Sequence, residues 1–318
     1  MKRILRSVFY TMLILTALPA RALAADLVPV GQLIGLQLRS DTLTVAAYDD
    51  SLGSASRDTG LKIGDELLSI DGEAVSSPEE VRAALSDAET VSLTVRRSGK
   101  VTTLRLTPCA TEDGPRLGVY LRQGISGIGT VTFYDPSTGL FGTLGHGVSD
   151  SSGQILPMKT GSAFAAEVLT VKKGKTGTPG QLKGEAGQVL GPLLRNTPQG
   201  VFGKVSKPFS GRTIPTAAYS DIQPGAAHIR STVCGSGVQE YSVEILKIYP
   251  EDRKDGRNFL LRVTDETLLQ TTGGIVQGMS GSPIIQDGKL VGAVTHVLVN
   301  SPDTGYGIFI ENMLEAAS

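Results

Sequence analysis

The sequence is poor in the residues from which cross-linked and metal-bound folds are built. Its 318 residues include only two cysteines, Cys109 and Cys234, and three histidines, His146, His228 and His296. Two cysteines form at most one disulfide, which excludes a disulfide framework and a cysteine-based metal site. The histidines lie far apart, without the short spacing of zinc ligands. We therefore expect neither a metal nor a cofactor.

Charge and aromatic side chains are also scarce. Tryptophan is absent, aromatic residues make up 5%, charged residues 19%, and the formal net charge is -1. With a hydrophobic share of 40%, the chain is too apolar and too weakly charged to be disordered. Its basic residues do not cluster as a phosphate-binding surface requires, so we expect no nucleic-acid partner.

Glycine, in contrast, is plentiful. The chain has 39 glycines, well above the usual share of about 7%. Many glycines and prolines with few aromatics and no long helical pattern predict a mainly β fold of short strands and tight turns. The length predicts two domains, each large enough to bury its own core.

Residues 1–25 have the pattern of a targeting segment. Basic residues lie at its start, an apolar run covers 8–18, and Ala22-Leu23-Ala24 is a small-residue cleavage site. The apolar run is short for a bilayer span. We expect the protein to be exported, with this segment either removed as a signal peptide or kept as an N-terminal membrane anchor.

Residues 31–108 are predicted to form a small α+β domain. Gly60, Gly64-Asp65 and Asp71-Gly72 stand at the turn positions of a PDZ domain, which this stretch resembles. Ser77, with proline next and glutamate three residues on, predicts a helix that starts there and runs to about Ser86. Alternating residues over 91–95 and 101–106 predict a hairpin.

The PDZ resemblance implies a peptide groove. In PDZ domains a Φ-Gly-Φ loop offers backbone N–H groups to a peptide carboxylate, and the peptide adds as a strand beside the helix. The matching piece is Ile34-Gly35-Leu36, which lies ahead of the domain's second strand. Val81 and Leu85, one helical turn apart, are the candidates for the helix side of the groove. All of these apolar residues could equally be core, because nothing in the sequence orients the helix.

Residues 117–318 are predicted to form a second, closed all-β domain. Apolar segments over 127–134 and 140–144, joined by a turn at 135–139, predict a hairpin that leads into Gly145-His146-Gly147. Flanking glycines leave the imidazole accessible, which suits a catalytic base. A lone histidine is nevertheless more often structural.

The strongest motif is Gly278-Met279-Ser280-Gly281-Ser282-Pro283. In such a turn a serine hydroxyl can point outward while the N–H groups of Gly278 and Ser280 converge as an oxyanion hole. Strands follow instead of a helix, which excludes the nucleophile elbow of α/β-hydrolases. The motif is similar to that of chymotrypsin-like serine peptidases, but Met279 replaces the aspartate that pairs with a new N-terminus there. We therefore do not expect activation by that route.

Taken together, five features of the chain resemble the SpoIVB (stage IV sporulation protein B) peptidase family. They are the targeting segment, the PDZ-like domain, the element at 144–147, the motif at 278–283 running into Val294-Thr295-His296, and Tyr306–Ile310. The resemblance covers almost the whole mature chain. It implies a serine endopeptidase of two six-stranded β-barrels, with Ser280 as nucleophile and His146 as base.

The resemblance also implies a cellular role. Members of the family are exported by the forespore into the space between two membranes, the forespore's and the mother cell's. There they cleave themselves and a regulatory partner of a membrane-embedded metalloprotease, so that a sigma factor is processed. The partners implied are therefore protein substrates and a membrane-bound regulatory complex.

The third member of the catalytic triad is less well defined. The resemblance places it at Asp265, fifteen residues before the serine. The group must accept a hydrogen bond from the far imidazole nitrogen of His146. Asp150, four residues after that histidine, could do so locally, and Asp135 and Asp221 are weaker candidates. Each could equally be an exposed turn aspartate.

Two further points concern specificity and the alternative function. His296 could shape the first specificity pocket, although we favour a satisfied core histidine. Gly273-Gly274 stand where related enzymes form the pocket floor, with no acidic side chain, which predicts a preference for small or apolar residues. The alternative function is a catalytically silent PDZ-bearing binding protein. The presence of both Ser280 and His146 favours the peptidase.

Overall fold

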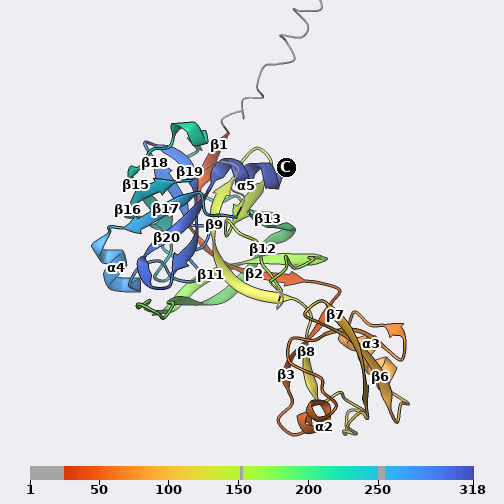
Figure 1. The fold of residues 1–318 in the computed structure, drawn as a ribbon. Coiled ribbons are helices and arrows are strands. Elements are labelled where there is room, and N and C mark those ends of the chain that lie inside the picture. The colour runs from red at the N-terminus through yellow and green to blue at the C-terminus, as the bar shows by residue number, and fades with distance from the viewer. Residues whose placement is uncertain (1–24, 151–152, 250–254) are drawn as a thin grey trace, which may run out of the picture.

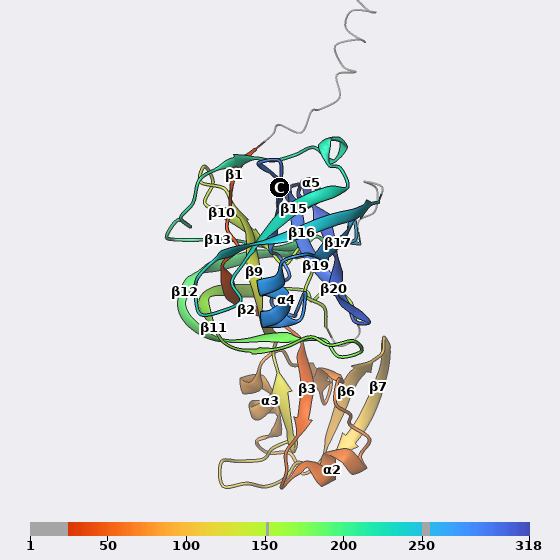
Figure 2. The same ribbon diagram turned by 90° about the vertical axis from the view of Figure 1, so that its left-hand side faces the viewer.

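The computed structural model describes residues 25–150, 153–249 and 255–318 (Figure 1). The predicted targeting segment, apart from Ala25, lies outside the described residues. Among the described residues, no helix has the length and apolar character needed to span a membrane. Strands dominate, in a pair of β-barrels and a separate small domain (Figures 1 and 2).

The first barrel is a closed ring of six antiparallel strands. Five pairings give the order β10-β13-β12-β11-β2-β9, and the pairing of β10 with β9 closes the ring. Beyond β9 the sheet continues through β1 (Asp26–Pro29) to β14 (Ile214–Pro215). The six ring strands are β2 (Leu33–Arg39), β9 (Ile125–Tyr134), β10 (Leu140–Thr143), β11 (Thr160–Lys172), β12 (Gln181–Thr197) and β13 (Gly200–Lys204).

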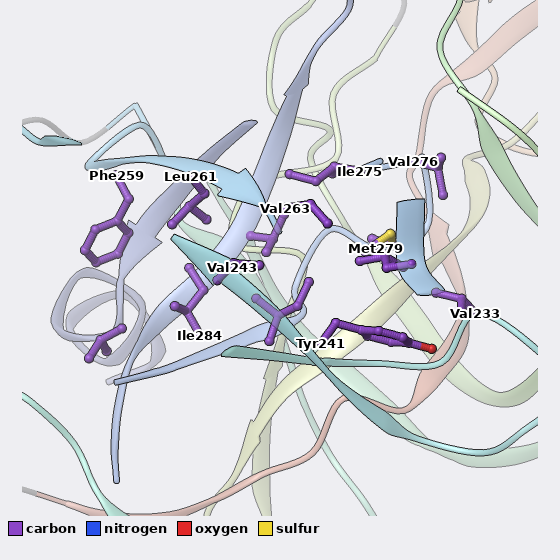
Figure 3. Packing of buried hydrophobic residues seen from close by; sticks show 14 of the residues in the cluster. Val233, Tyr241, Val243, Phe259, Leu261, Val263, Ile275, Val276, Met279 and Ile284 are labelled. Carbon is purple, nitrogen blue, oxygen red and sulfur yellow. The ribbon is translucent and has the colours of Figure 1, made fainter. Parts of the chain in front are cut away.

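The second barrel is also closed, in the order β15-β16-β17-β20-β19-β18. Its interior is packed with aliphatic side chains and Phe259, seen at close range in Figure 3. The short helices η1 (Tyr219–Asp221), α4 (Glu266–Thr272) and α5 (Ile310–Ala317) complete this half. The barrel strands are β15 (Gly225–Ser231), β16 (Gln239–Ile248), β17 (Phe259–Val263), β18 (Pro283–Gln286), β19 (Lys289–Leu298) and β20 (Ser301–Phe309). The predicted double-barrel, mainly β fold is confirmed.

The small domain has a sheet of order β7-β6-β4-β3-β8, with β5 paired to β4. Its helix α3 (Pro78–Leu85) begins as predicted, because the Ser77 side chain accepts a hydrogen bond from the Glu80 N–H at 3.2 Å. The predicted hairpin is present as β6 and β7. The remaining elements are β3 (Leu43–Tyr48), α2 (Gly53–Asp58), β4 (Glu66–Ile70), β5 (Glu73–Ala74), β6 (Val91–Arg97), β7 (Lys100–Leu106) and β8 (Val119–Arg122).

Asp65, the acidic residue of the Gly-Asp turn, links this turn to the sheet of the small domain. Its side chain is buried and binds Arg97 through both oxygens, each at 2.6 Å from a guanidinium nitrogen. One of those oxygens also accepts the Lys62 N–H at 2.9 Å. Arg97 reaches on to the Gly60 carbonyl at 2.7 Å. A buried carboxylate with this many partners ties the turn to β6.

The domain boundaries differ from the prediction. Residues 26–39 form β1 and β2 of the first barrel, so the small domain starts after Arg39 and ends with β8, before β9. Because β2 and β9 pair with each other, the small domain is an insertion between two neighbouring barrel strands. In both views it projects from the barrels at this point (Figures 1 and 2).

This topology contradicts the prediction that Ile34-Gly35-Leu36 forms a carboxylate-binding loop. The three residues lie inside β2, hydrogen-bonded to β9 on one side and β11 on the other. Ile34 is fully buried and packs in the first barrel's core. A strand paired on both edges has no free N–H groups for a peptide, so this segment cannot serve the PDZ groove.

Candidate active site

His146 follows the end of β10, on a turn held in an unusual backbone conformation. Leu144 has a φ of +70°, in the left-handed region that non-glycine residues rarely occupy. Beyond the histidine, the Asn196 side chain of β12 fixes the chain by accepting the Val148 N–H at 2.9 Å and donating to the Val148 and Leu156 carbonyls. Such strain persists only where the surroundings enforce it, and here it directs His146 toward the second barrel.

The nucleophile loop belongs to the second barrel but is held by β9 of the first. The Thr130 N–H donates to the Ser280 carbonyl at 2.9 Å, and the Thr130 hydroxyl donates to the Gly278 carbonyl at 2.8 Å. Thr132 donates to the Gly281 carbonyl at 2.8 Å. Both threonines are fully buried. These bonds fix the serine relative to the barrel that carries His146.

Gly281 brings the two barrels into backbone contact. A Cβ at this position would lie 2.0 Å from the Thr130 carbonyl oxygen and 2.5 Å from the Leu144 nitrogen, and φ is +95°. Both distances are far below those of real Cβ contacts. Only glycine therefore allows the nucleophile loop to approach the strands that lead to His146.

Met279, between the two predicted oxyanion residues, anchors the loop through its side chain. It is fully buried in the core of the second barrel, among the other core side chains that Figure 3 labels. An aspartate in this apolar site would be a costly buried charge. The loop is thus held by apolar packing where chymotrypsin-like enzymes use an ion pair.

Ser280 and His146 line one cavity of about 460 Å³ between the two barrels. The barrel-one wall comes from β2, β9 and the turn after β10, and the barrel-two wall from the nucleophile loop and β19. Most of the lining is apolar: Leu36, Leu38, Ile125, Ile128, Leu144, Val148, Ile275, Val276 and Val297. The structure therefore brings together the two residues that the sequence singled out for chemistry.

In this structure the Ser280 hydroxyl is turned away from the base. It donates a hydrogen bond of 2.8 Å to the Thr295 carbonyl. Although both residues are described, no hydrogen bond joins Ser280 to the His146 ring. Rotation of the serine side chain about χ1 is required before it can give its proton to the histidine.

The His146 ring is already in the tautomer that a base requires. Nδ1 lies 3.0 Å from the Gly147 carbonyl oxygen, and because a carbonyl only accepts, Nδ1 carries the proton. The lone pair is therefore on Nε2. Burial lowers the pKa of His146 below its ordinary value, while the bond to Gly147 opposes this shift. The ring is neutral at neutral pH and able to accept a proton.

The predicted oxyanion donors are available. Across the described residues, neither the Gly278 nor the Ser280 N–H donates to a protein acceptor. Backbone N–H groups without partners beside a nucleophile are the usual means of stabilising an oxyanion.

The prediction that Asp265 orients His146 is contradicted. Asp265 is the N-cap of α4, where it accepts the Leu268 N–H at 2.9 Å and, through its other oxygen, the Ser242 N–H at 3.4 Å. It does not line the cavity, and no carboxylate of the described residues contributes to the pKa of His146. The residue type that suits a catalytic acid is equally the one that suits a helix N-cap.

The other aspartates also lie elsewhere. Asp150 lines a different cavity, between the first barrel and the small domain, and accepts the Gln154 N–H. Asp135 accepts bonds from the hairpin turn that it begins, and Asp221 pairs with Lys289. Among the described carboxylates, none takes the position beside the base that the triad model expected.

His296 lies in the catalytic cavity, a few ångströms from the base. Its ring centroid is 5.2 Å from that of His146, with the planes tilted by 37°. Within the described residues its Nδ1 is buried without a hydrogen-bond partner. The favoured interpretation of a satisfied core histidine is therefore wrong.

The small domain has its own groove, of about 490 Å³, between α3 and β8. Val81 and Leu85 line it from the helix, as expected, and both are also part of the domain's core. The Φ-Gly-Φ segment at its mouth is Leu117-Gly118-Val119, which runs into β8, an edge strand. Our sequence reasoning missed this segment because it lies beyond the assumed end of the domain.

No metal centre is apparent in the described part of the chain, where no three His, Cys, Asp or Glu side chains gather as ligands. The chemistry of the cavity is that of a serine, two imidazoles and backbone amides.

Comparison with known families agrees with this geometry. The family model described as SpoIVB peptidase S55 matches residues 113–314, which is more than half of the chain. The chain belongs to the SpoIVB peptidase family. A PDZ domain model also matches residues 51–97.

Other relatives are more distant. "Putative zinc metalloprotease Atu1380" of Agrobacterium fabrum and "Putative zinc metalloprotease R01501" of Rhizobium meliloti are each 38% identical over 79 residues, 24% of this chain and 21% of theirs. The chain thus spans about a fifth of the length of these curated relatives.

Solved structures resemble the chain weakly. The active form of the Rv3671c protease from M. tuberculosis is 13% identical, with 60% of this chain and 72% of that chain covered and a TM-score of 0.37. HtrA-type protease AlgW with a decapeptide is 11% identical, with 76% and 66% covered and a TM-score of 0.36. The fold assignment rests on the strand pairings.

Proposed function

We propose that the peptidase cleaves exported proteins by acyl transfer through Ser280, with His146 as general base. One observation carries the proposal: a single cavity holds this serine, a neutral imidazole whose Nε2 lone pair is free to take a proton, and two unpartnered backbone amides. Each is a part that serine-peptidase chemistry needs.

The first half of the reaction forms an acyl-enzyme. The Ser280 hydroxyl turns from the Thr295 carbonyl and gives its proton to Nε2 of His146 as Oγ bonds to the substrate carbonyl carbon. The C=O electrons move to oxygen, where the N–H groups of Gly278 and Ser280 donate to the oxyanion. Nε2 then returns the proton to the amide nitrogen, and the C–N bond breaks.

The second half uses water. The water oxygen bonds to the acyl carbon while one of its protons passes to Nε2 of His146. The bond from carbon to the Ser280 Oγ then breaks, and Oγ takes that proton back. The enzyme is restored, and the balance is one water consumed per peptide bond.

The cavity lining supports an apolar substrate. Its walls are mainly leucine, isoleucine and valine side chains, and among the described residues no lysine, arginine, aspartate or glutamate lines it. A charged substrate side chain in this cavity would lose water without gaining a partner. We expect small or apolar residues next to the cleaved bond.

The PDZ groove supports recognition of a second peptide segment. β8 has one edge paired with β3 and lies beside α3, so an added peptide strand would continue the sheet. Arg82 lines the groove, as do Arg116 and Asp113, which pair with each other at 2.7 Å. The charge of Arg82 favours a peptide carboxylate. This groove would capture the substrate or a terminus of the enzyme itself.

Family membership supports the cellular setting of a sporulation signalling protease. We propose export into the space between forespore and mother cell, with self-cleavage and cleavage of a regulatory partner of a membrane-embedded metalloprotease leading to sigma factor processing. Residues 1–25 would act as the signal or membrane tether. In the producing organism, the Ser280→Ala protein should be exported normally but leave that partner uncut.

The enzymatic proposal is tested with purified full-length chains. We expect the wild-type protein to cleave itself and an apolar peptide library, and Ser280→Ala and His146→Ala to do neither. Ser282→Ala is the matched control, because Ser282 is buried and bonds Ser231 at 3.0 Å away from the cavity. Equal cleavage by wild type and Ser280→Ala, or none by wild type, would leave only a peptide-binding protein.

A further inference from the structure

The catalytic cavity contains a second histidine to which the proposed mechanism gives no task. His296 lies near the end of β19, and its ring is 5.2 Å from that of His146. The two imidazoles come from different barrels and meet at the same cavity as Ser280. Whatever His296 does is therefore done beside the base.

Neighbouring segments fix the backbone on either side of His296. Thr295, next in the chain, donates through its hydroxyl to the Gly256 carbonyl at 2.6 Å. Gly256 in turn lies against the Cε1 edge of the His296 ring. Tyr306 is the cross-strand neighbour on β20, and Arg257 lies over its ring. The backbone that carries the imidazole is thus tied to β20 by strand pairing and to Gly256 through Thr295.

The charge state of His296 follows from the groups that face it. Burial first, then His146 and Arg257, lower its pKa to about 4, while Asp255 opposes them. The ring is therefore neutral at neutral pH. A neutral imidazole has one nitrogen that accepts a hydrogen bond, and the Nδ1 of His296 is the nitrogen buried without a partner among the described residues.

His146, in contrast, lacks the group that normally stabilises a catalytic imidazolium. Its Nδ1 is bound by the Gly147 carbonyl, and no described carboxylate acts on it. When it takes the serine proton it becomes a partly buried cation, which is costly without an opposite charge nearby. Two independent observations therefore concern neighbouring rings: His296 has a buried nitrogen without a hydrogen-bond partner, and the His146 cation has no described carboxylate to stabilise it.

We propose that His296 is the positioning residue of the base, and that its neutral imidazole stabilises the His146 imidazolium in the place of a triad carboxylate. The inference rests on the proposed role of His146 as general base. It requires Nδ1 of His296 to be unprotonated, with the proton on Nε2. The dipole of the neutral His296 ring stabilises the His146 imidazolium less than a carboxylate would, but it avoids burying a second charge.

The test compares His296→Asn with His296→Leu in the full-length chain. The two side chains are similar in size, but asparagine keeps a polar acceptor near the position of Nδ1. We expect the leucine variant to lose kcat roughly tenfold to hundredfold, the rate equivalent of one hydrogen bond to a charged group, with KM nearly unchanged. The asparagine variant should recover most of that loss.

A second readout does not depend on activity. The chain has three histidines, so the imidazole signals can be assigned by NMR from single variants and the His146 pKa followed directly. We expect His296→Leu to lower the His146 pKa and His296→Asn to restore it. His228→Leu is the control, because His228 lies on β15 beside Glu240, away from the cavity.

The outcomes separate the inference from the proposed function. An unchanged or raised His146 pKa in His296→Leu overturns the inference, as does an equal loss of kcat in both variants. A change confined to KM or to peptide preference would make His296 a wall of the substrate pocket, and this too overturns it. If the wild-type protein does not cleave at all, the proposed function fails, and the NMR titration still decides what His296 does to His146.

Discussion

Replacing Gly281 by alanine tests whether the contact between the barrels positions the nucleophile. The added methyl group would lie 2.0 Å from the Thr130 carbonyl oxygen, and φ is +95°. The loop cannot simply withdraw, because the Gly281 N–H bonds the Val294 carbonyl and Thr130 bonds the Ser280 carbonyl. Either the nucleophile loop or the backbone at Thr130 and Leu144 must therefore move, which changes the position of Ser280 relative to His146.

The expected magnitude follows from three contributions. A left-handed φ costs an L-residue about 1–2 kcal/mol, overpacking about 1–3 kcal/mol, and a weakened backbone hydrogen bond about 1 kcal/mol. Gly281→Ala should therefore lower the free energy of unfolding by about 3–6 kcal/mol. Gly288→Ala is the matched control, because Gly288 has a φ of +74° with no atom within 4 Å of an added Cβ, and it should cost only about 1–2 kcal/mol.

The assay is denaturant unfolding of both variants, followed by kcat at a temperature where both remain folded. We expect Gly281→Ala to lose kcat by roughly a hundredfold, the effect of an ångström-scale misplacement of catalytic groups, while Gly288→Ala keeps the wild-type value. Equal destabilisation of the two variants would refute the steric argument. A fully active Gly281→Ala protein would refute the link from this contact to the position of Ser280.

Three further outcomes follow from the site. Asp265→Ala should lower the free energy of unfolding by about 1 kcal/mol through the lost N-cap, and Asp265→Ser should recover most of that loss. Both variants should keep a near wild-type kcat. A hundredfold loss of kcat in the serine variant would instead show that the carboxylate is catalytic. Thr130→Val leaves the Gly278 carbonyl without its buried donor, which should cost about 1–3 kcal/mol in unfolding measurements and lower kcat; wild-type values for both would show that the bond is dispensable. Because burial lowers the pKa of His146, kcat/KM should fall with decreasing pH only below about 6.5, the ordinary histidine value; a midpoint above it would contradict the neutral, buried base.

The sequence predicted local structure correctly where that structure depends only on residues close together in the chain. Ser77 caps α3 by reaching an N–H three residues away, and Asp287-Gly288 turns β18 into β19 with both residues at positive φ. The same holds for the settings of His146 and Ser280, each marked by flanking glycines. These patterns depend on a few consecutive residues, so they can be recognised without knowing what packs against them.

The prediction of the carboxylate-binding loop was wrong because it depended on which strands pair with each other. Ile34-Gly35-Leu36 and Leu117-Gly118-Val119 are the same pattern of an apolar residue, glycine and an apolar residue. The first is paired on both edges inside a barrel, and the second opens into an edge strand beside a helix. Only the order of strands in the sheets distinguishes them, because edge availability is a property of neighbours distant in the chain.

The sequence by itself determined the class of fold, the nucleophile and base candidates, and the turns that present them, because those depend on residue type and short spacing. Tertiary structure decided which groups support the base. It placed Asp265 on a helix cap, with its carboxylate bound to backbone N–H groups, and placed His296 next to His146 across the barrel interface. The physical reason is that a polar side chain acts on whatever folding brings within a few ångströms, and 150 residues separate these two histidines along the chain.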